Sequence, residues 1–247
     1  MQKFVDKFHR TIDYLRISIT DKCNLRCIYC MPEEGIKLYN HEEILSYEEI
    51  TRIVKVAVGL GVKKIRITGG EPLVKKDLSF LISSLNSIVG VVDISMTTNG
   101  TLLKRFAKEL FDAGLKRVNV SLDTFKPDRY KQITRGGNID DVFAGIDEAE
   151  KVGLRPIKIN MVPIRGINDD EIESFARLTM HKDWQVRFIE FMPFGSRDVW
   201  TPERYISTDE IKQRISDIAP IKPLKLRSSG PARYYKFDDA NGVIGRL

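Results

Sequence analysis

Residues 14–30 read YLRISITDKCNLRCIYC, and they indicate the architecture more clearly than the rest of this 247-residue chain. The first six residues alternate apolar and polar side chains, a pattern typical of a β-strand whose two faces meet different surroundings. Three cysteines, Cys23, Cys27 and Cys30, follow this strand. In barrels built from strand–helix units, the loops after the strands form the active site. The stretch therefore predicts a strand that leads into a functional loop.

Strand-like and helical patterns alternate along the rest of the chain. We expect strands at residues 14–19, 64–68, 92–97, 117–122, 156–161 and 186–191. We expect helices at residues 47–59, 77–89, 102–113, 139–152 and 169–180. This order predicts an α/β fold of parallel βαβ units, a partial (β/α)6 barrel over residues 1–219. Residues 220–247 hold short strand-like runs and turn signals at 228–230 and 241–242, so we expect a small C-terminal β hairpin extension.

Local signals mark several helix ends. Three residue pairs have the spacing of N-terminal capping boxes: Ser46 with Glu49, Asn168 with Glu171, and Ser207 with Glu210. Gly61, Gly114 and Gly153 each stand between a helical pattern and a strand. Because glycine suits the left-handed position after a helix, these residues predict a repeated helix-to-strand turn.

Polar side chains recur with one parity along the predicted strands. These polar side chains include Arg16, Arg66, Thr97, Ser121 and Lys158. Because successive strand residues point to opposite faces, these side chains are expected to share the face that lines the barrel. A polar lining is costly unless a polar ligand or water fills it. An antiparallel sheet with one solvated face is the alternative that this pattern leaves open.

The composition points to a cytoplasmic protein that binds a metal centre. The first ten residues have no apolar signal-peptide core, and no apolar stretch is long enough to span a membrane. The net charge of +6 is mild, so it does not by itself indicate a nucleic-acid-binding protein. All three cysteines fall within residues 23–30, which in a reducing compartment favours metal over disulfide. Three thiolates can hold a [4Fe–4S] cluster with one iron open to a ligand. A zinc site completed by His9 or His41 is the alternative.

Several motifs together identify a family resemblance. The spacing of Cys23, Cys27 and Cys30, with Tyr29 before the last, resembles the signature of the radical S-adenosylmethionine (SAM) superfamily, and residues 69–72 (GGEP) resemble its glycine-rich turn. Six stretches in order are similar to the GTP 3′,8-cyclase (MoaA) family of molybdenum cofactor biosynthesis. They are residues 13–24, 65–73, 97–100, 118–123, 166–171 and 187–192.

The resemblance implies roles for particular residues. Cys23, Cys27 and Cys30 would ligate the [4Fe–4S] cluster, and the SAM-contacting positions would be Tyr29, Gly70, Ser121 and Met192. The GTP-contacting positions would be Arg16, Arg66, Thr97 and Lys158. Three of these are cations, which suits a triphosphate. The resemblance further implies a lyase that cyclises GTP through a 5′-deoxyadenosyl radical and passes its product to the next enzyme of the pathway, with a homo-oligomer as a possible assembly.

The chain also departs from the pattern of this family. A second cysteine triad that binds the guanine is expected further along such proteins, yet no cysteine follows Cys30 here. We therefore expect either a chain that is truncated within its C-terminal extension or a protein in which the second site is genuinely absent. The alternatives are a radical SAM enzyme with a different substrate, a SAM-cleaving fragment unable to cyclise GTP, and a non-catalytic module stabilised by metal.

Overall fold

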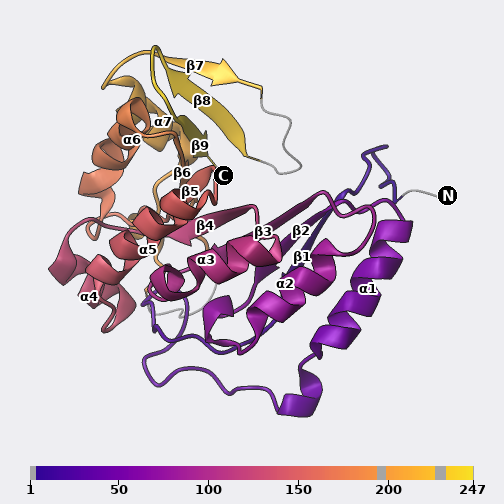
Figure 1. Cartoon of the computed structure of the whole chain (residues 1–247). Coiled ribbons are helices and arrows are strands. Elements are labelled where there is room, and N and C mark those ends of the chain that lie inside the picture. The colour runs from indigo at the N-terminus through magenta and orange to yellow at the C-terminus, as the bar shows by residue number, and fades with distance from the viewer. Residues whose placement is uncertain (1–3, 194–198, 226–231, 247) are drawn as a thin grey trace. The chain divides into compact units, whose positions relative to one another are not determined.

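The computed structural model describes residues 4–193, 199–225 and 232–246 (Figure 1). The chain separates into two compact units. The first comprises Met1–Asn24, Lys37–Asn119 and Ala144–Arg155, and the second comprises Leu25–Ile36, Val120–Phe143 and Pro156–Leu247. The expected turn at residues 228–230 lies outside the described residues. No helix within the described ranges combines the length and the apolar character needed to cross a membrane.

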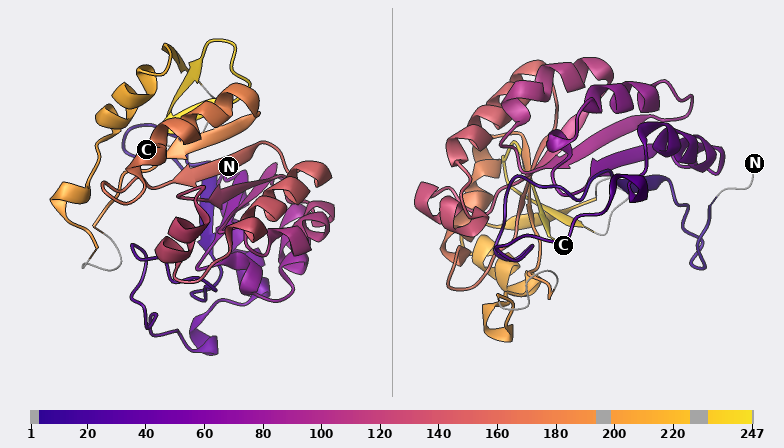
Figure 2. Two further views of the ribbon diagram at one scale, coloured as in Figure 1. Left: turned by 90° about the vertical axis from the view of Figure 1, so that its left-hand side faces the viewer. Right: turned by 90° about the horizontal axis from the view of Figure 1, so that it is seen from below.

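The first unit is a parallel sheet covered by helices. Its strands are β1 (Tyr14–Ser18), β2 (Lys64–Thr68) and β3 (Asp93–Thr98), and its helices are α1 (Tyr47–Gly59), α2 (Leu78–Asn86) and α3 (Leu103–Ala113). Short 3-10 helices η1 (His41–Glu43) and η2 (Pro72–Val74) lie between them. β1 pairs with β2 and β2 with β3, both in parallel. The three helices lie on one side of the three strands (Figures 1 and 2).

The two faces of this sheet differ as the alternating pattern predicts. The apolar residues of β2, Ile65 and Ile67, are fully buried, whereas Arg66 between them is partly exposed. Leu81 and Leu85 of α2 are fully buried as well. Burying such side chains stabilises the fold by about 1.5–3 kcal/mol each, so the apolar face fixes which way the polar face points.

The predicted local signals are mostly present. Ser46 and Glu49 form a complete capping box at the start of α1. Gly61, Gly114 and Gly153 have φ angles of +107°, +113° and +96°, as the helix-to-strand turns require. Ser207 caps α7 by accepting from Glu210 N–H, but the Glu210 carboxylate pairs with Arg165 instead of completing the box.

The second unit combines parallel and antiparallel pairing. Its strands follow the order β5 (Ile157–Met161), β6 (Trp184–Phe188), β9 (Val243–Arg246), β8 (Arg233–Phe237) and β7 (Ile221–Leu224). Its helices are α4 (Pro127–Thr134), η3 (Asp169–Glu171), α6 (Ile172–His181), η4 (Pro202–Arg204) and α7 (Thr208–Ser216). α6 packs against β6, β9 and α7. β4 (Arg117–Ser121) and α5 (Ile139–Val152) each have residues in both units.

Two sequence expectations differ from the structure of this unit, and a third is confirmed. The last barrel strand, β6, begins and ends earlier than residues 186–191. The C-terminal extension contains the expected antiparallel pairing, of β7 with β8 and of β8 with β9, and β9 joins it to the sheet by pairing in parallel with β6. This junction requires Gly242, since a Cβ there would lie 2.2 Å from the carbonyl oxygen of Trp184. The capping box expected at Asn168 is wrong, because its side chain makes no cap and binds other backbone groups.

We predict that Asp170 stabilises the second unit in a pH-dependent way. Hydrogen bonding from Arg129, assisted by Lys126, lowers the pKa of Asp170 from 3.8 to about 2. The stabilisation is therefore present above pH ~4 and is lost as the pH falls towards ~2. The Asp170 side chain is 50% exposed, so Asp170→Asn should cost no more than about 1 kcal/mol at neutral pH. Denaturant unfolding at pH 7 and pH 3 measures the difference.

The matched control is Asp112→Asn, which removes an exposed helical ion pair with Lys108. It should cost about 0.3–0.5 kcal/mol at neutral pH. A cost for Asp170→Asn that grew as the pH fell would contradict the prediction.

Candidate functional site

Within the described residues, none of the three cysteines is in a disulfide; Cys23 and Cys27 are partly exposed and Cys30 is exposed. Cys23 belongs to the first unit, and Cys27 and Cys30 belong to the second. Among the described residues, no three His, Cys, Asp or Glu side chains are grouped so as to hold one metal ion. The ligand set therefore stays a prediction, and each unit shows how its own cysteines are held.

In the first unit, an amide side chain points at Cys23. Asn99, just after β3, donates from Nδ2 to Cys23 Sγ at 3.9 Å and to Asn24 Oδ1 at 2.9 Å. Its Oδ1 accepts from the backbone N–H and the hydroxyl of Thr101, at 3.0 and 2.8 Å. Because the oxygen is engaged by two donors, the amide nitrogen is the atom that faces the sulfur. A donor in this position suits a thiolate.

Behind Asn99 lies a buried carboxylate, Glu71 of the glycine-rich turn. Glu71 is 1% exposed. Its oxygens accept from Thr98 Oγ1 at 2.7 Å, Leu73 N–H at 3.0 Å and Asn99 N–H at 2.6 Å. Burial raises the pKa of Glu71, while these three hydrogen bonds oppose the rise. Glu71 thus joins the end of β2 to the end of β3.

The glycines before Glu71 allow a close approach to the cysteine loop. Gly70 N–H donates to Thr20 O at 2.7 Å, and Glu71 N–H donates to Lys22 O at 2.8 Å. A Cβ at Gly70 would lie 2.2 Å from Lys22 O, so a larger residue would push the two segments apart. The glycine-rich turn therefore fixes the backbone immediately before Cys23.

In the second unit, Cys27 and Cys30 lie in one tight turn. The N–H groups of Cys30 and Met31 both donate to Cys27 O, at 2.9 and 3.2 Å. The end of α4 holds this turn through backbone bonds from Arg26 to Thr134 and from Ile28 to Ile133. Arg135 Nη1 also donates to the carbonyls of Arg26 and Met31, at 3.1 and 3.0 Å. Sequence analysis missed α4, an eight-residue helix that begins at Pro127.

Tyr29, inside this turn, reaches a second buried carboxylate. Its hydroxyl donates to Asp123 Oδ2 at 2.6 Å. Burial, reinforced by the charge of Asp123, raises the pKa of Tyr29 well above its usual value. Burial also raises the pKa of Asp123 to about 6, although hydrogen bonds from Tyr29 and Val162 oppose the rise. Asp123 ends one of the six family-like stretches but was not predicted to act in the site.

The polar face of the first unit brings predicted substrate residues together. Arg16 lies opposite Arg66 in the register of β1 and β2, and Arg66 lies opposite Ser95 of β3. Thr97 is two residues further along β3 and shares that face. The guanidinium of Arg66 lies over the ring of Tyr14, 5.2 Å from its centroid. Arg16 is exposed.

The second unit carries the remaining predicted residues. Lys158 is 8% exposed and lies opposite Gln185, Ser121 ends β4, and Met192 lies beyond β6 and is about half exposed. Sequence analysis missed Arg187, which has the parity of Gln185 and is 6% exposed. Its Nη2 donates to the hydroxyl of Tyr234 at 2.7 Å. The same alternating parity, followed into β6, would have found it.

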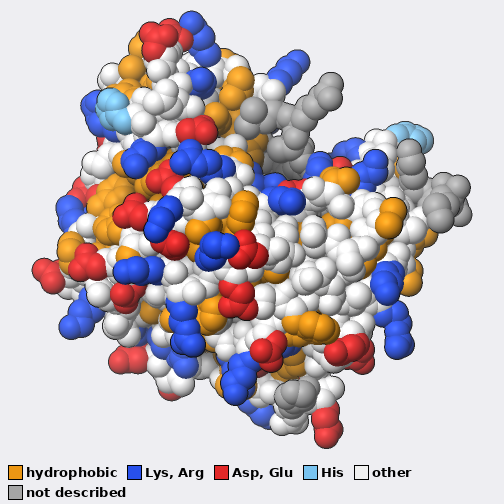
Figure 3. Space-filling view, viewed as in Figure 1, with side chains coloured by type: hydrophobic (Ala, Val, Ile, Leu, Met, Phe, Trp, Pro, Cys, Tyr) orange, Lys and Arg blue, Asp and Glu red, His pale blue; other side chains and the backbone are white. Residues whose placement is uncertain are grey.

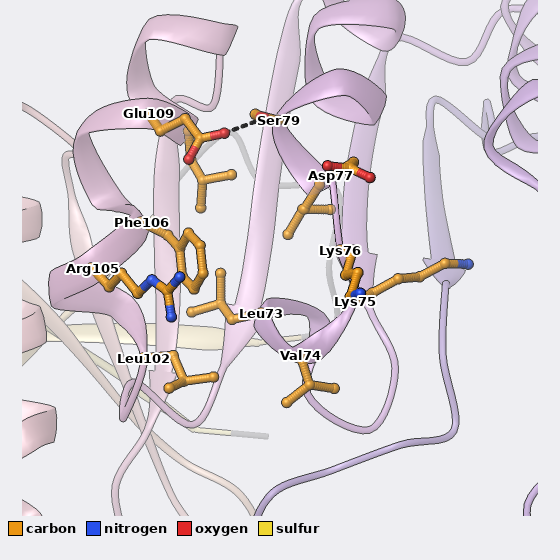
Figure 4. Close-up of a pocket in the computed structure, with 12 residues that line it drawn as sticks. Leu73, Val74, Lys75, Lys76, Asp77, Ser79, Leu102, Arg105, Phe106 and Glu109 are labelled. Carbon is orange, nitrogen blue, oxygen red and sulfur yellow. Dashed lines mark hydrogen bonds between the residues drawn. The ribbon is translucent and has the colours of Figure 1, made fainter.

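A separate pocket of about 430 Å³ lies in the first unit, between η2, α2 and α3 (Figure 4). It has apolar walls from Leu73, Leu102 and Phe106, and a hydrogen bond joins Ser79 to Glu109 at one side. None of the predicted cluster, SAM or GTP residues lines it. Acidic and basic side chains are intermingled on the face shown in Figure 3.

Comparisons with known proteins agree with this arrangement. The radical SAM superfamily matches residues 17–179, and the family described as Molybdenum Cofactor Synthesis C matches residues 184–247. The GTP 3′,8-cyclase of Thermodesulfovibrio yellowstonii is 58% identical over 242 residues, covering 97% of this chain and 75% of that protein. The GTP 3′,8-cyclase of Alkaliphilus oremlandii is 52% identical over 242 residues, covering 98% of this chain and 75% of that protein. The chain thus spans three quarters of the length of these relatives.

A solved structure shows the same fold. Streptococcus suis SuiB bound to S-adenosylmethionine has a TM-score of 0.63 at 19% identity, and the match covers 83% of this chain and 47% of that one. Together with the superfamily match, this likeness confirms the predicted α/β partial barrel with its C-terminal β extension.

We predict that Glu71 is essential to the local structure of the first unit. Glu71→Ala would leave Thr98 Oγ1 and two backbone N–H groups without their acceptor, at a cost on the order of 3 kcal/mol in the free energy of unfolding. Glu71→Gln keeps an acceptor oxygen and should cost less. Denaturant unfolding measures both, with Glu109→Ala, which removes a partly exposed surface contact, as the control. Equal costs for Glu71→Ala and Glu109→Ala would contradict the prediction.

Proposed function

Because the chain belongs to the GTP 3′,8-cyclase family of the radical SAM superfamily, we propose that it converts GTP to (8S)-3′,8-cyclo-7,8-dihydroguanosine 5′-triphosphate. The observation that carries this conclusion is 58% identity to a GTP 3′,8-cyclase over 97% of the chain. The reaction is the first step of molybdenum cofactor biosynthesis and makes the enzyme a lyase. Its cofactors are a [4Fe–4S] cluster and SAM, so a zinc site with His9 or His41 is not favoured.

The three thiols fit the cluster that the family uses. When bound, the cluster and SAM supply a 5′-deoxyadenosyl radical that abstracts the hydrogen atom at C3′ of GTP. Cys23, Cys27 and Cys30 would hold the cluster and leave one iron open for SAM. Two features support this assignment: within the described residues the three thiols form no disulfide, and the Asn99 amide presents an N–H to Cys23 Sγ. Hydrogen-bonded thiolates are the usual ligands of such clusters.

The SAM-binding positions are proposed at Tyr29, Gly70, Ser121 and Met192. Gly70 stands where the glycine-rich turn touches the cysteine loop, and Ser121 stands at the end of β4. Tyr29 lies in the same turn as Cys27 and Cys30. Ligands of α/β folds bind beyond the carboxyl ends of the strands, where these residues occur.

The GTP-binding positions are proposed at Arg16, Arg66, Thr97 and Lys158. Arg16 and Arg66 lie side by side across β1 and β2, which places two cations on one face. Two cations on one face suit a bound triphosphate. GTP is the substrate. We further propose that the product passes to the next enzyme of the pathway, that the protein acts in the cytoplasm, and that it forms a homo-oligomer.

The test is one anaerobic reaction of the reconstituted chain with GTP, SAM and a chemical reductant. Chromatography should detect 5′-deoxyadenosine and the cyclised nucleotide, both dependent on GTP. 5′-Deoxyadenosine without the cyclised nucleotide would support the alternative of a SAM-cleaving chain that cannot complete the cyclisation. Cleavage of SAM that GTP does not affect would favour a different substrate, and an absence of both products would contradict the proposal.

We predict that the cluster depends on Cys27. Cys27→Ala should lose the brown chromophore and most of the bound iron and sulfide, because two thiolates cannot retain a cubane cluster. Iron and sulfide analysis after anaerobic reconstitution measures this. Met31→Leu is the control, because it changes a buried neighbour in the same turn and should retain the cluster. A full cluster in Cys27→Ala would show that the ligands are misassigned.

We predict that Arg16, Arg66 and Lys158 contribute to GTP affinity. Removing any one of these charged side chains should weaken binding by about one to two decades, the equivalent of about 1.5–3 kcal/mol. Added salt should weaken binding by the wild-type chain as well. The measurement is GTP titration of the single Ala variants, with Arg105→Ala in the separate pocket as the control. Unchanged affinity in all three variants would show that these side chains do not bind GTP.

A further inference from the structure

The Cys27–Cys30 turn is anchored on a side chain as well as on α4. Tyr29, in the middle of the turn, is half-buried and reaches towards the end of β4. Its hydroxyl donates to Asp123 Oδ2 at 2.6 Å. Backbone bonds from α4 hold the first part of the turn, at Arg26 and Ile28, and the Arg135 side chain holds the carbonyl of Met31 at its end. The Tyr29 hydroxyl holds its centre, between the two cysteines.

Asp123 is itself held firmly. Its second oxygen, Oδ1, accepts from Val162 N–H at 2.8 Å, just after β5. Asp123 follows Ser121 by two residues at the end of β4 and is 6% exposed. A carboxylate with both oxygens engaged and almost no exposure has one low-energy position. Asp123 therefore connects the ends of β4 and β5 to the Cys27–Cys30 turn.

The residues expected to form a capping box at Asn168 support Asp123 instead. Asn168 Nδ2 donates to the carbonyls of Asp123 and Val162, at 2.8 and 3.0 Å, and its Oδ1 accepts from Ile164 N–H at 2.7 Å. Three residues later, Glu171 accepts from Thr124 Oγ1 and from Phe125 N–H. This motif thus fixes the backbone on both sides of the Asp123 carboxylate.

We propose that Asp123 is a positioning residue for the radical reaction: through Tyr29 it fixes the Cys27–Cys30 turn against the ends of β4 and β5, and Asn168 holds Asp123 in place. The inference rests on the proposed function for its consequence, SAM binding at the cluster, but the contacts themselves lie within the second unit. Removing a residue that hydrogen-bonds to a metal ligand and orients it typically lowers metal affinity or activity ten- to a hundredfold.

Asp123 positions the turn through its hydrogen bond with Tyr29 and not through its negative charge. Asn has the shape of Asp and can serve both the Tyr29 hydroxyl and the Val162 N–H, so Asp123→Asn should preserve the connection. Asp123→Ala removes both acceptors and should break it. Tyr29→Phe removes the same hydrogen bond and keeps the half-buried aromatic ring. Asn168→Ala should have a smaller effect in the same direction.

The first experiment uses the cluster-free chain and does not depend on catalysis. Amide hydrogen exchange of the peptide that covers residues 26–31 should be at least tenfold faster in Tyr29→Phe and Asp123→Ala than in the wild type, and unchanged in Asp123→Asn. Asp93→Asn is the matched control, since it alters a partly buried carboxylate that pairs with Arg117 at the start of β3. Equal exchange of this peptide in the wild type, Tyr29→Phe and Asp123→Ala would overturn the inference.

The second experiment uses the anaerobically reconstituted, reduced chain. SAM binding is followed by the change that it causes in the electron paramagnetic resonance spectrum of the cluster. The affinity for SAM should fall about ten- to a hundredfold in Tyr29→Phe and Asp123→Ala, and stay within about threefold of the wild type in Asp123→Asn. The double variant should be no weaker than either single variant, because both remove one connection. Additive losses, or an Asp123→Asn chain as weak as Asp123→Ala, would overturn the inference.

The two experiments separate this inference from the proposed function. A wild-type chain that binds no SAM, yet shows faster exchange in the variants, would contradict the proposed function and support the anchoring of the turn. A wild-type chain that binds SAM and forms cyclised product, with variants that match it in exchange and affinity, would leave the proposed function standing and overturn the inference.

Discussion

A buried carboxylate must find hydrogen-bond donors, and in this fold it finds them in the loops that hold the predicted site. Glu71, Asp123 and Glu171 are 1%, 6% and 4% exposed. Each accepts one backbone N–H from a neighbouring loop, namely those of Asn99, Val162 and Phe125. An unpaired carboxylate at such depth would cost several kcal/mol, so these bonds tie the loops at strand ends to one another. This constraint explains how the loops at the strand ends are held in place.

The same constraint explains how the polar residues near the cysteines are held by hydrogen bonds. Glu71 fixes Asn99, and Asn99 then presents its amide to Cys23 Sγ. In the second unit, Asp123 fixes Tyr29 in the turn that carries Cys27 and Cys30. A catalytic group held within a fraction of an ångström needs such second contacts, because loops alone are too mobile. Each unit therefore prepares its own share of the cysteines.

The sequence predicted periodic and local features well, and long-range hydrogen bonds poorly. Alternation placed Arg16 and Arg66 on one face, and the register of β1 and β2 agrees. The capping box at Ser46 was predictable because all its bonds lie within four residues. Asn168 has the same local pattern, but its side chain satisfies the carbonyls of Asp123 and Val162 instead of a helix end. No local rule identifies such distant partners, and the cluster, SAM and GTP positions stay predictions for a similar reason.

The polar face of the second unit is better explained by binding than by folding. Lys158 is 8% exposed and Arg187 is 6% exposed, whereas the same strands could have buried apolar residues at lower cost. Arg187 donates to Tyr234, whose hydroxyl is a neutral partner for a full positive charge. A neutral partner compensates only part of the lost hydration, so the folded chain gains little from placing Arg187 there. An anionic ligand would add to that compensation, which is consistent with the proposed GTP-binding role of Lys158 on the same face.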